Sequence, residues 1–198
     1  MKPYIKKSFY LVILLLAILA LTMPASAETG KIIKNFPVDK GGTLVIESNV
    51  GSIFVGTWDR DEVSVIVVKR ASRKGQVAEF APRIEQRGND VYVKGENEQN
   101  NPVTVEYNVN IPKNFNVDLK TGKGSIKVTD IKGNIKLITS DGGIRVGNVT
   151  GGNVYAQTSG DSIRVGNVEG DVKVDTSGGS VRLGKITGKS SVNEPNSI

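Results

Sequence analysis

The stretch "TSGDSIRVGNVEGDVKVDTSGGSVRLG" occupies residues 158–184 and begins to repeat itself before it ends. The Thr-Ser-Gly of 158–160 returns at 176–178, and the Ile-Arg-Val of 163–165 returns as Val-Arg-Leu at 181–183. A fixed interval of this kind is the sequence signature of a repeat architecture, in which each unit packs against the next.

Four such units follow one another with a period of 18 residues and one extra glycine at 151/152. A threonine opens each unit, and a glycine stands at its thirteenth place. The units are TGKGSIKVTDIKGNIKLI (121–138), TSDGGIRVGNVTGGNVYAQ (139–157), TSGDSIRVGNVEGDVKVD (158–175) and TSGGSVRLGKITGKSSVN (176–193). The threonines are Thr121, Thr139, Thr158 and Thr176. The glycines are Gly133, Gly151, Gly170 and Gly188.

Aliphatic and polar residues alternate within each unit, as Ile163 and Val165 do around Arg164. Alternation with period two predicts β-strands with one buried face. The units could stack in parallel as coils, or each could form a hairpin of an antiparallel meander. Tyr155 is the only aromatic residue in 121–198, which favours narrow coils, because a meander needs a second layer over its apolar face. We therefore predict an all-β fold, a parallel β-helix or β-solenoid with 18-residue coils.

Residues 28–120 are rich in predicted strands but less regular, and we expect them to form a broader N-terminal cap on the coils of 121–193. The segment 41–70 reads as a divergent repeat, in which "NVGSIFVGTW" parallels "TSGGSVRLGKI" and "DEVSVIVV" supplies the second strand. "KGQVAEFAP" (74–82) predicts a short helix ended by Pro82, and "RIEQRGNDVYVKG" (83–95) predicts a hairpin. A polar tail, 194–198, ends the chain.

The first 27 residues predict a secretory signal peptide. Lysines precede an apolar run from Leu11 to Met23, and Ala25-Ser26-Ala27 supplies a cleavage site after Ala27. Removing 1–27 lowers the formal net charge from +6 to +3, since three lysines and no acid are lost. An exported protein with so small a charge excess is a poor candidate for nucleic-acid binding, and we expect an extracellular, cell-surface or periplasmic location.

The chain contains neither cysteine nor histidine. These absences exclude disulfides, thiolate metal sites and the Ser-His-Asp and Cys-His catalytic arrangements. We expect no cofactor and no metal site.

Three stretches together resemble a known family: "LVIESNVGSIFVGTWDRDEVSV", "YNVNIPKNFNVDLKTGKGSIKV" and the reiterated "TSGGSVRLGKITG". The chain resembles, over nearly all of 30–190, the bacterial "putative adhesin" family of exported β-solenoid proteins, also described as a domain of unknown function. The resemblance implies a right-handed coil on an extracytoplasmic protein and carries over no catalytic residue. The fourth unit departs from the pattern, with Ser190 where earlier units have an aliphatic residue.

The seventh place of every unit is basic, and we call these residues the basic ladder: Lys127, Arg145, Arg164 and Arg182. In stacked coils they would lie about 5 Å apart on the outer face. Like charges that close repel by about 1 kcal/mol per pair in water, so the ladder favours nearby counter-charges or an anionic partner. The alternative is a solvated face that duplication has retained.

Three other motifs are weaker. "KRASRK" predicts a basic loop of four cations, which are Lys69, Arg70, Arg73 and Lys74. Gly184 and Gly188 imitate a phosphate-binding loop but enclose three residues instead of four, so no nucleotide is expected. Asp59, Asp61 and Glu62 could form a carboxylate cluster, although neighbours on a strand point to opposite faces and a polar turn explains them better.

These features favour a non-enzymatic, adhesin-like binding or scaffold protein of the bacterial cell envelope, with an anionic envelope polysaccharide or a surface protein as partner. Two alternatives stay open. One is a carbohydrate-active β-helix enzyme, a lyase or hydrolase of acidic polysaccharide, and the other is an accessory of envelope stress signalling.

Overall fold

The computed structural model describes residues 27–73, 75–97 and 102–195. In this part of the chain every regular element is a strand except α2 (Gln76–Glu79), a single helical turn. No helix in these ranges is long and apolar enough to span a bilayer. The predicted signal peptide, apart from Ala27, and the end of the predicted polar tail lie outside the described residues.

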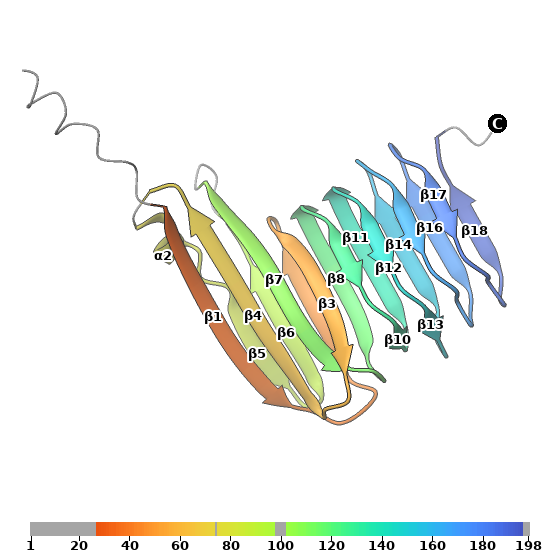
Figure 1. Ribbon diagram of the computed structural model, residues 1–198, viewed down its shortest axis with the longest axis horizontal. Coiled ribbons are helices and arrows are strands. Elements are labelled where there is room, and N and C mark those ends of the chain that lie inside the picture. Colours follow the sequence, from red (N-terminus) through yellow and green to blue (C-terminus); the bar gives the residue numbers. More distant parts are fainter. Residues whose placement is uncertain (1–26, 74, 98–101, 196–198) are drawn as a thin grey trace, which may run out of the picture.

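Two eight-stranded sheets run the length of the molecule, one in front of the other (Figure 1). Sheet A has the order β1 (Glu28–Pro37), β4 (Glu62–Ala71), β7 (Val103–Pro112), β3 (Ser52–Trp58), β9 (Ile126–Val128), β12 (Ile144–Val146), β15 (Ile163–Val165), β17 (Val181–Leu183). Sheet B has the order β5 (Arg83–Arg87), β6 (Asp90–Gly95), β2 (Thr43–Ser48), β8 (Asn116–Lys123), β11 (Ile135–Asp141), β14 (Val154–Thr158), β16 (Val172–Thr176), β18 (Ser190–Asn193). A short third sheet pairs β10 (Ile131–Lys132) with β13 (Val149–Thr150).

Successive repeat units pair in parallel, residue for residue. Ile144 lies opposite Ile163, 19 positions further on, and Ile163 lies opposite Val181, 18 positions further on. The same in-register parallel pairing links β8, β11, β14, β16 and β18 on sheet B. The parallel direction is incompatible with the antiparallel meander, in which neighbouring strands would run in opposite directions.

Aliphatic side chains fill the space between the sheets, as the alternation predicts. In β15 the flanking Ile163 and Val165 are buried while Arg164 is exposed, and β9 and β12 show the same pattern, whereas β17 and β18 do not. Val149 and Val168, the lone aliphatic residues between the two strands of a unit, are buried as well. Burying these rows is the main force that holds one unit against the next.

The threonine that opens each unit is a buried hydrogen-bond donor. Thr139 Oγ1 donates to the Gly124 carbonyl at 2.8 Å, and Thr158 Oγ1 donates to the Gly142 carbonyl at the same distance. Thr121 and Thr176 make equivalent bonds, and all four threonines are at most 2% exposed. Each hydroxyl therefore satisfies a corner carbonyl of the preceding unit, which explains why threonine recurs at a core position.

A column of tightly packed glycines forms one corner. A side chain at Gly170 would collide with the Gly152 carbonyl oxygen, and one at Gly152 would collide with the Gly133 carbonyl oxygen. The residue stacked at the thirteenth place of the second unit is thus Gly152, not Gly151 as the sequence alignment had it. Gly151, with φ of 61°, is the inserted residue, and a Cβ atom at this position would contact no backbone atom.

Amide and carboxylate side chains bridge neighbouring units at the same corner. Asn116 Oδ1 accepts the Asn134 backbone N–H at 2.9 Å, and Asn134 Oδ1 accepts the Asn153 N–H at 3.0 Å. Asn153 and Asp171 continue the series to the following units. These bonds pair the backbone N–H groups of the residues that immediately precede β11, β14, β16 and β18.

In the N-terminal half, some strands pair in parallel with the repeat units, and others pair antiparallel with one another. Within the segment 41–70, which was predicted to be a divergent repeat, β2 pairs in parallel with β8 and β3 pairs in parallel with β9. The prediction for "DEVSVIVV" was wrong, because β4 joins sheet A antiparallel to β1 and β7 instead of supplying a strand to sheet B. The predicted hairpin of 83–95 is confirmed as β5 and β6, and α2 ends before Pro82.

The C-terminal unit is the least buried. Val181 and Leu183 are partly exposed, whereas Ile163 and Val165 at the same places of the preceding unit are buried. Ser190 lies opposite Val172, as the departure in the fourth unit predicts, and β18 is exposed throughout. β17 and β18 stand at the ends of their sheets, so no further strand covers them in the described residues.

Candidate functional site

The basic ladder lies on the outer face of sheet A, one residue on each of β9, β12, β15 and β17. Lys127 is opposite Arg145, Arg145 is opposite Arg164, and Arg164 is opposite Arg182 in parallel register. Each is exposed and stands between two inward-facing aliphatic residues. Because neighbouring strands lie about 4.8 Å apart, the side chains of neighbouring rungs project from the sheet at that spacing.

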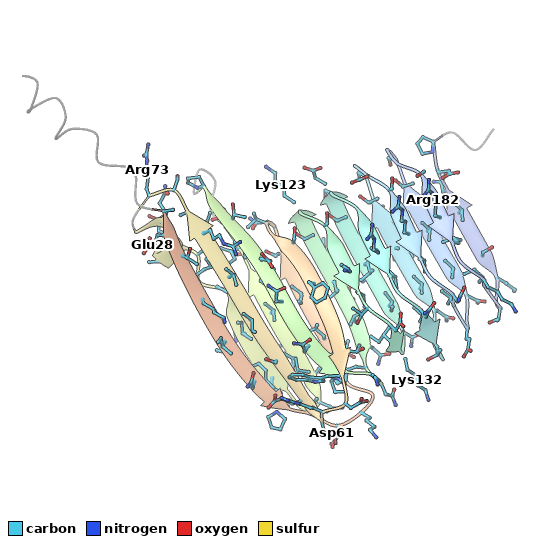
Figure 2. The ribbon with its side chains drawn as sticks, in the orientation of Figure 1. Glu28, Asp61, Arg73, Lys123, Lys132 and Arg182 are labelled. Carbon is cyan, nitrogen blue, oxygen red and sulfur yellow. The ribbon has the colours of Figure 1, made fainter. Side chains whose placement is uncertain are left out.

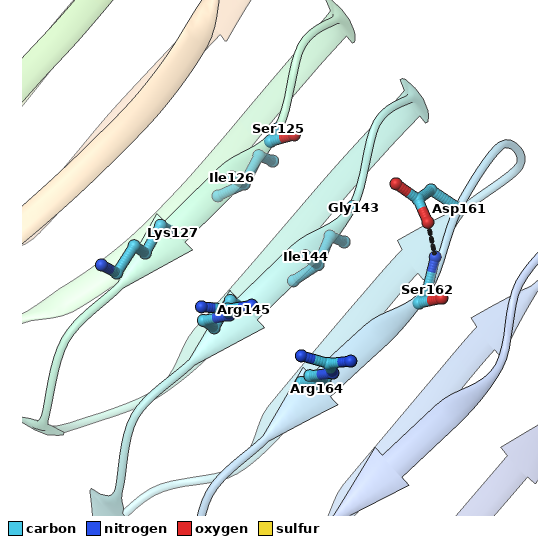
Figure 3. Close-up of a pocket in the computed structure, with 9 residues that line it drawn as sticks. All are labelled: Ser125, Ile126, Lys127, Gly143, Ile144, Arg145, Asp161, Ser162 and Arg164. Carbon is cyan, nitrogen blue, oxygen red and sulfur yellow. Dashed lines mark hydrogen bonds between the residues drawn. The ribbon is translucent and has the colours of Figure 1, made fainter.

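Small residues precede and follow each rung of the ladder, and an open trough runs beside the first three rungs. The residues two positions before each rung are Ser125, Gly143, Ser162 and Ser180, and those two positions after it are Thr129, Gly147, Gly166 and Gly184. A groove of about 360 Å³ follows the first three rungs and is lined by Ser125, Gly143 and Ser162 beside them (Figure 3). The first three cationic side chains therefore border an open groove on the side of Ser125, Gly143 and Ser162.

No member of the ladder forms an ion pair with any residue in the described part of the chain. Lys127 Nζ lies 5.3 Å from the ring centre of Phe54, which occupies the next place of the same row on β3. Asp161 is the one acid that lines the groove, and its carboxylate accepts the Ser162 backbone N–H at 2.6 Å (Figure 3). The row thus keeps an excess of positive charge that no ion pair within the described ranges neutralises.

The predicted basic loop does not form as a single surface. Lys69 and Arg70 belong to β4, and Lys69 is only 8% exposed, with Nζ donating to the Phe80 carbonyl at 2.7 Å. Arg70 is exposed and lies 3.5 Å from Glu106. Arg73 is exposed beyond the strand, while Lys74 lies outside the described residues. A buried lysine that anchors a loop carbonyl cannot share a binding surface with the exposed cations.

The carboxylates of "WDRDEV" do not converge. Asp59 pairs with Lys113 at 3.0 Å, and Asp61 stands in the same exposed turn, whereas Glu62 begins β4. Among the described residues no group of three or more acidic, histidine or cysteine side chains is placed to hold a metal ion. Gly184 and Gly188 lie at tightly packed corners of the last unit, and no helix follows them up to residue 195.

Comparisons with known proteins give weak structural similarity only. No family model matches the chain, and no curated protein does. Similar solved structures include a "putative cell adhesion protein" from Clostridium sporogenes, with 15% identity, coverage of 84% of this chain and 99% of that one, and a TM-score of 0.39. A "putative adhesin" from Bacteroides fragilis gives 10% identity, coverages of 83% and 96%, and a TM-score of 0.25.

A "putative lipid binding protein" from Parabacteroides distasonis gives 13% identity, coverages of 85% and 96%, and a TM-score of 0.24. TM-scores this low do not establish a shared fold, so the architecture rests on this chain's own strand pairing.

Sequence reasoning placed the four rungs but missed their surroundings. Phe54 belongs to the row only because β3 pairs with β9, across an interval of more than 70 residues. The serines and glycines beside the ladder were visible as "GSIKV" and "DSIRVG", but their significance depends on the parallel register. A search of the residues two positions on either side of each rung would have found them.

Proposed function

We propose that this chain is a right-handed β-solenoid, with residues 28–120 as its cap and 121–193 as its coils, and that it serves as a non-enzymatic, adhesin-like binding protein of the bacterial cell envelope. Its ligand is an anionic envelope polysaccharide that lies along sheet A and contacts the basic ladder. The predicted signal peptide supports export. The resemblance of the repeats to the exported adhesin-like family supports the same location.

One observation carries the proposal: exposed cations lie in register on consecutive strands, and none of them is paired with an acid among the residues that the structure describes. A polymer with one carboxylate per sugar can place successive charges along successive rungs. A single exposed ion pair contributes at most about 1 kcal/mol, so one rung alone would bind weakly. Several rungs that act on one chain gain affinity through effective concentration, which suits a repetitive ligand.

Because of the trough, the ladder is better suited to binding a polymer than an arbitrary charged protein surface would be. Serine hydroxyls on one side can donate to carboxylate or hydroxyl oxygens of a sugar. The glycines that follow Arg145, Arg164 and Arg182 add no side chain beside these guanidinium groups. Arginine, which occupies three of the four rungs, holds carboxylates with two parallel hydrogen bonds.

The test is co-sedimentation of the mature protein with insoluble polygalacturonate, with cellulose as the neutral control. The variant Arg145→Gln/Arg164→Gln removes the two central rungs. Arg83→Gln/Arg87→Gln is the matched control, since it removes the same charge from β5 on sheet B, where both arginines pair with Glu85.

We expect salt-sensitive binding that the ladder variant loses and the control variant retains. Equal loss in both variants would mean that net charge alone is responsible, and wild-type protein that ignores polygalacturonate would refute the proposal. New reducing ends or unsaturated sugars in the supernatant would replace it with the enzyme hypothesis.

A further inference from the structure

A second concave site lies where several turns meet at one edge of the molecule. Its volume is about 410 Å³, and it is lined by Trp58 at the end of β3, the turn that follows it, the turn after β7, Lys40 and Lys132. Figure 2 shows Asp61 and Lys132 at this edge, opposite the edge that carries Arg73 and Lys123. The volume is within the range of about 300–1,000 Å³ that is usual for small-ligand pockets.

Trp58 forms a fixed wall of this pocket. Its indole Nε1–H donates to the Glu62 carbonyl at 2.8 Å, and the ring is half-buried. The Arg60 guanidinium lies 4.8 Å from the centre of the ring. Stacking on an aromatic face limits the motion of an arginine while leaving its N–H donors available at the edge of the plane. Arg60 is therefore a partly preorganised hydrogen-bond donor for an oxyanion.

The remaining charges give the pocket a positive excess. Four cations line it, Lys40, Arg60, Lys113 and Lys132, against two acids, Asp59 and Asp61. Lys113 is paired with Asp59 at 3.0 Å. Lys40, Arg60 and Lys132 form no ion pair with any residue that the structure describes. Their charges come from three separate segments and converge on one cavity, whereas the basic ladder extends along a sheet.

We propose that this pocket binds the single oxyanion group, phosphate or carboxylate, of a small ligand or of a polymer end. Arg60 donates to the oxyanion in a bidentate manner, Lys40 and Lys132 neutralise its charge, and Trp58 packs against the attached carbon skeleton. Asp61 is the acid that limits how much negative charge the pocket accepts. The site is independent of the basic ladder and does not require the function proposed for it.

The single tryptophan of the chain makes the site directly observable. It gives one indole N–H signal in a ¹H–¹⁵N spectrum, and we follow that signal during titration of the mature protein. The probes are glycerol 1-phosphate and glucuronate, with glycerol and glucose as the matched neutral probes. We expect a saturable shift with one or both oxyanions and none with the neutral compounds. A response to only one oxyanion identifies the source of the anionic group.

The variant Arg60→Gln/Lys132→Gln should weaken the affinity about tenfold or more, because charge-assisted hydrogen bonds are lost. Both side chains are exposed, so the fold should be retained. Arg145→Gln/Arg164→Gln should leave the titration unchanged, which separates this site from the basic ladder. The absence of a saturable indole shift, or an unchanged affinity in Arg60→Gln/Lys132→Gln, would overturn the proposal.

Discussion

Replacing Thr158 by valine tests whether the recurring threonines hold the units together. Valine has nearly the same shape, so it fills the buried position without a cavity while the hydroxyl is lost. The Gly142 carbonyl then loses the donor that lies 2.8 Å away in the wild type, and the Gly160 N–H loses its acceptor at 3.3 Å.

A buried polar group left without its partner costs about 1–3 kcal/mol. For a chain of this size, each kcal/mol corresponds to about 2–4 °C in Tm, so we expect a decrease of about 2–12 °C. The assay is reversible thermal and urea unfolding followed by far-ultraviolet circular dichroism. The urea m-value should stay constant, since the surface exposed on unfolding is unchanged.

Thr150→Val is the matched control, because Thr150 is an exposed strand residue of the same type. This substitution should change the free energy of unfolding by less than about 0.5 kcal/mol. Equal stability of the Thr158→Val and Thr150→Val proteins would refute the reasoning. It would mean that the hydroxyl-to-carbonyl bonds contribute nothing and that threonine recurs for another reason.

Two further predictions concern stability. Gly152→Ala should destabilise the protein by about 1–3 kcal/mol, since the new methyl group collides with the Gly133 carbonyl. It should destabilise the protein more than Gly151→Ala, where only the backbone conformation is unfavourable. Urea midpoints that rank the two variants the other way would contradict the stacking at this corner. Burial raises the pKa of Tyr107 to about 12, against the opposing effect of its hydrogen bond with Ser48. As the pH rises, the unfolded chain therefore loses this proton before the folded protein does. The contribution of Tyr107 to the free energy of unfolding is fully present below about pH 10 and is lost as pH rises towards 12. Tyr107→Phe should remove that part of the alkaline decline in urea midpoint, and an identical decline in the variant would contradict this reasoning.

The stacking of the repeats could be predicted from sequence because two local signals agree. Alternation places Ile163 and Val165 on one face, and the 18-residue period brings the next unit's equivalents to the same place. The sequence could not predict which of the two sheets β4 joins, since its run of valine and isoleucine suits a buried strand in either sheet. Sheet membership depends on long-range pairing, which local periodicity does not encode.

Lys69 was misplaced for a different reason. The inward face of β4 is Val63, Val65, Val67 and Ala71, and Lys69 occupies the one remaining place in that series. Extending the alternation by one more step would have predicted its burial, but its proximity to Arg70 and Arg73 suggested a loop. The carbonyl of Phe80, contributed by the segment around α2, then supplies the partner that a buried ammonium group needs.

The rungs of the candidate site were predictable, and its electrostatic setting was not. Period and alternation together fix that residues 145 and 164 face outward at neighbouring positions. The absence of paired acids among the described residues, and the row that continues to Phe54, depend on which strands border β9. The pocket beside Trp58 depends still more on tertiary structure, since turns from distant parts of the chain form it.

The salt dependence of polygalacturonate binding tests the basic ladder most directly. Affinity is measured at increasing salt for the wild type, for Arg164→Gln, for Arg145→Gln/Arg164→Gln and for the control Arg83→Gln/Arg87→Gln. If the rungs contact successive carboxylates, the logarithmic slope becomes shallower with each rung removed and stays at the wild-type value in the control, because fewer counterions are released. Slopes that change equally in the ladder and control variants would contradict the account.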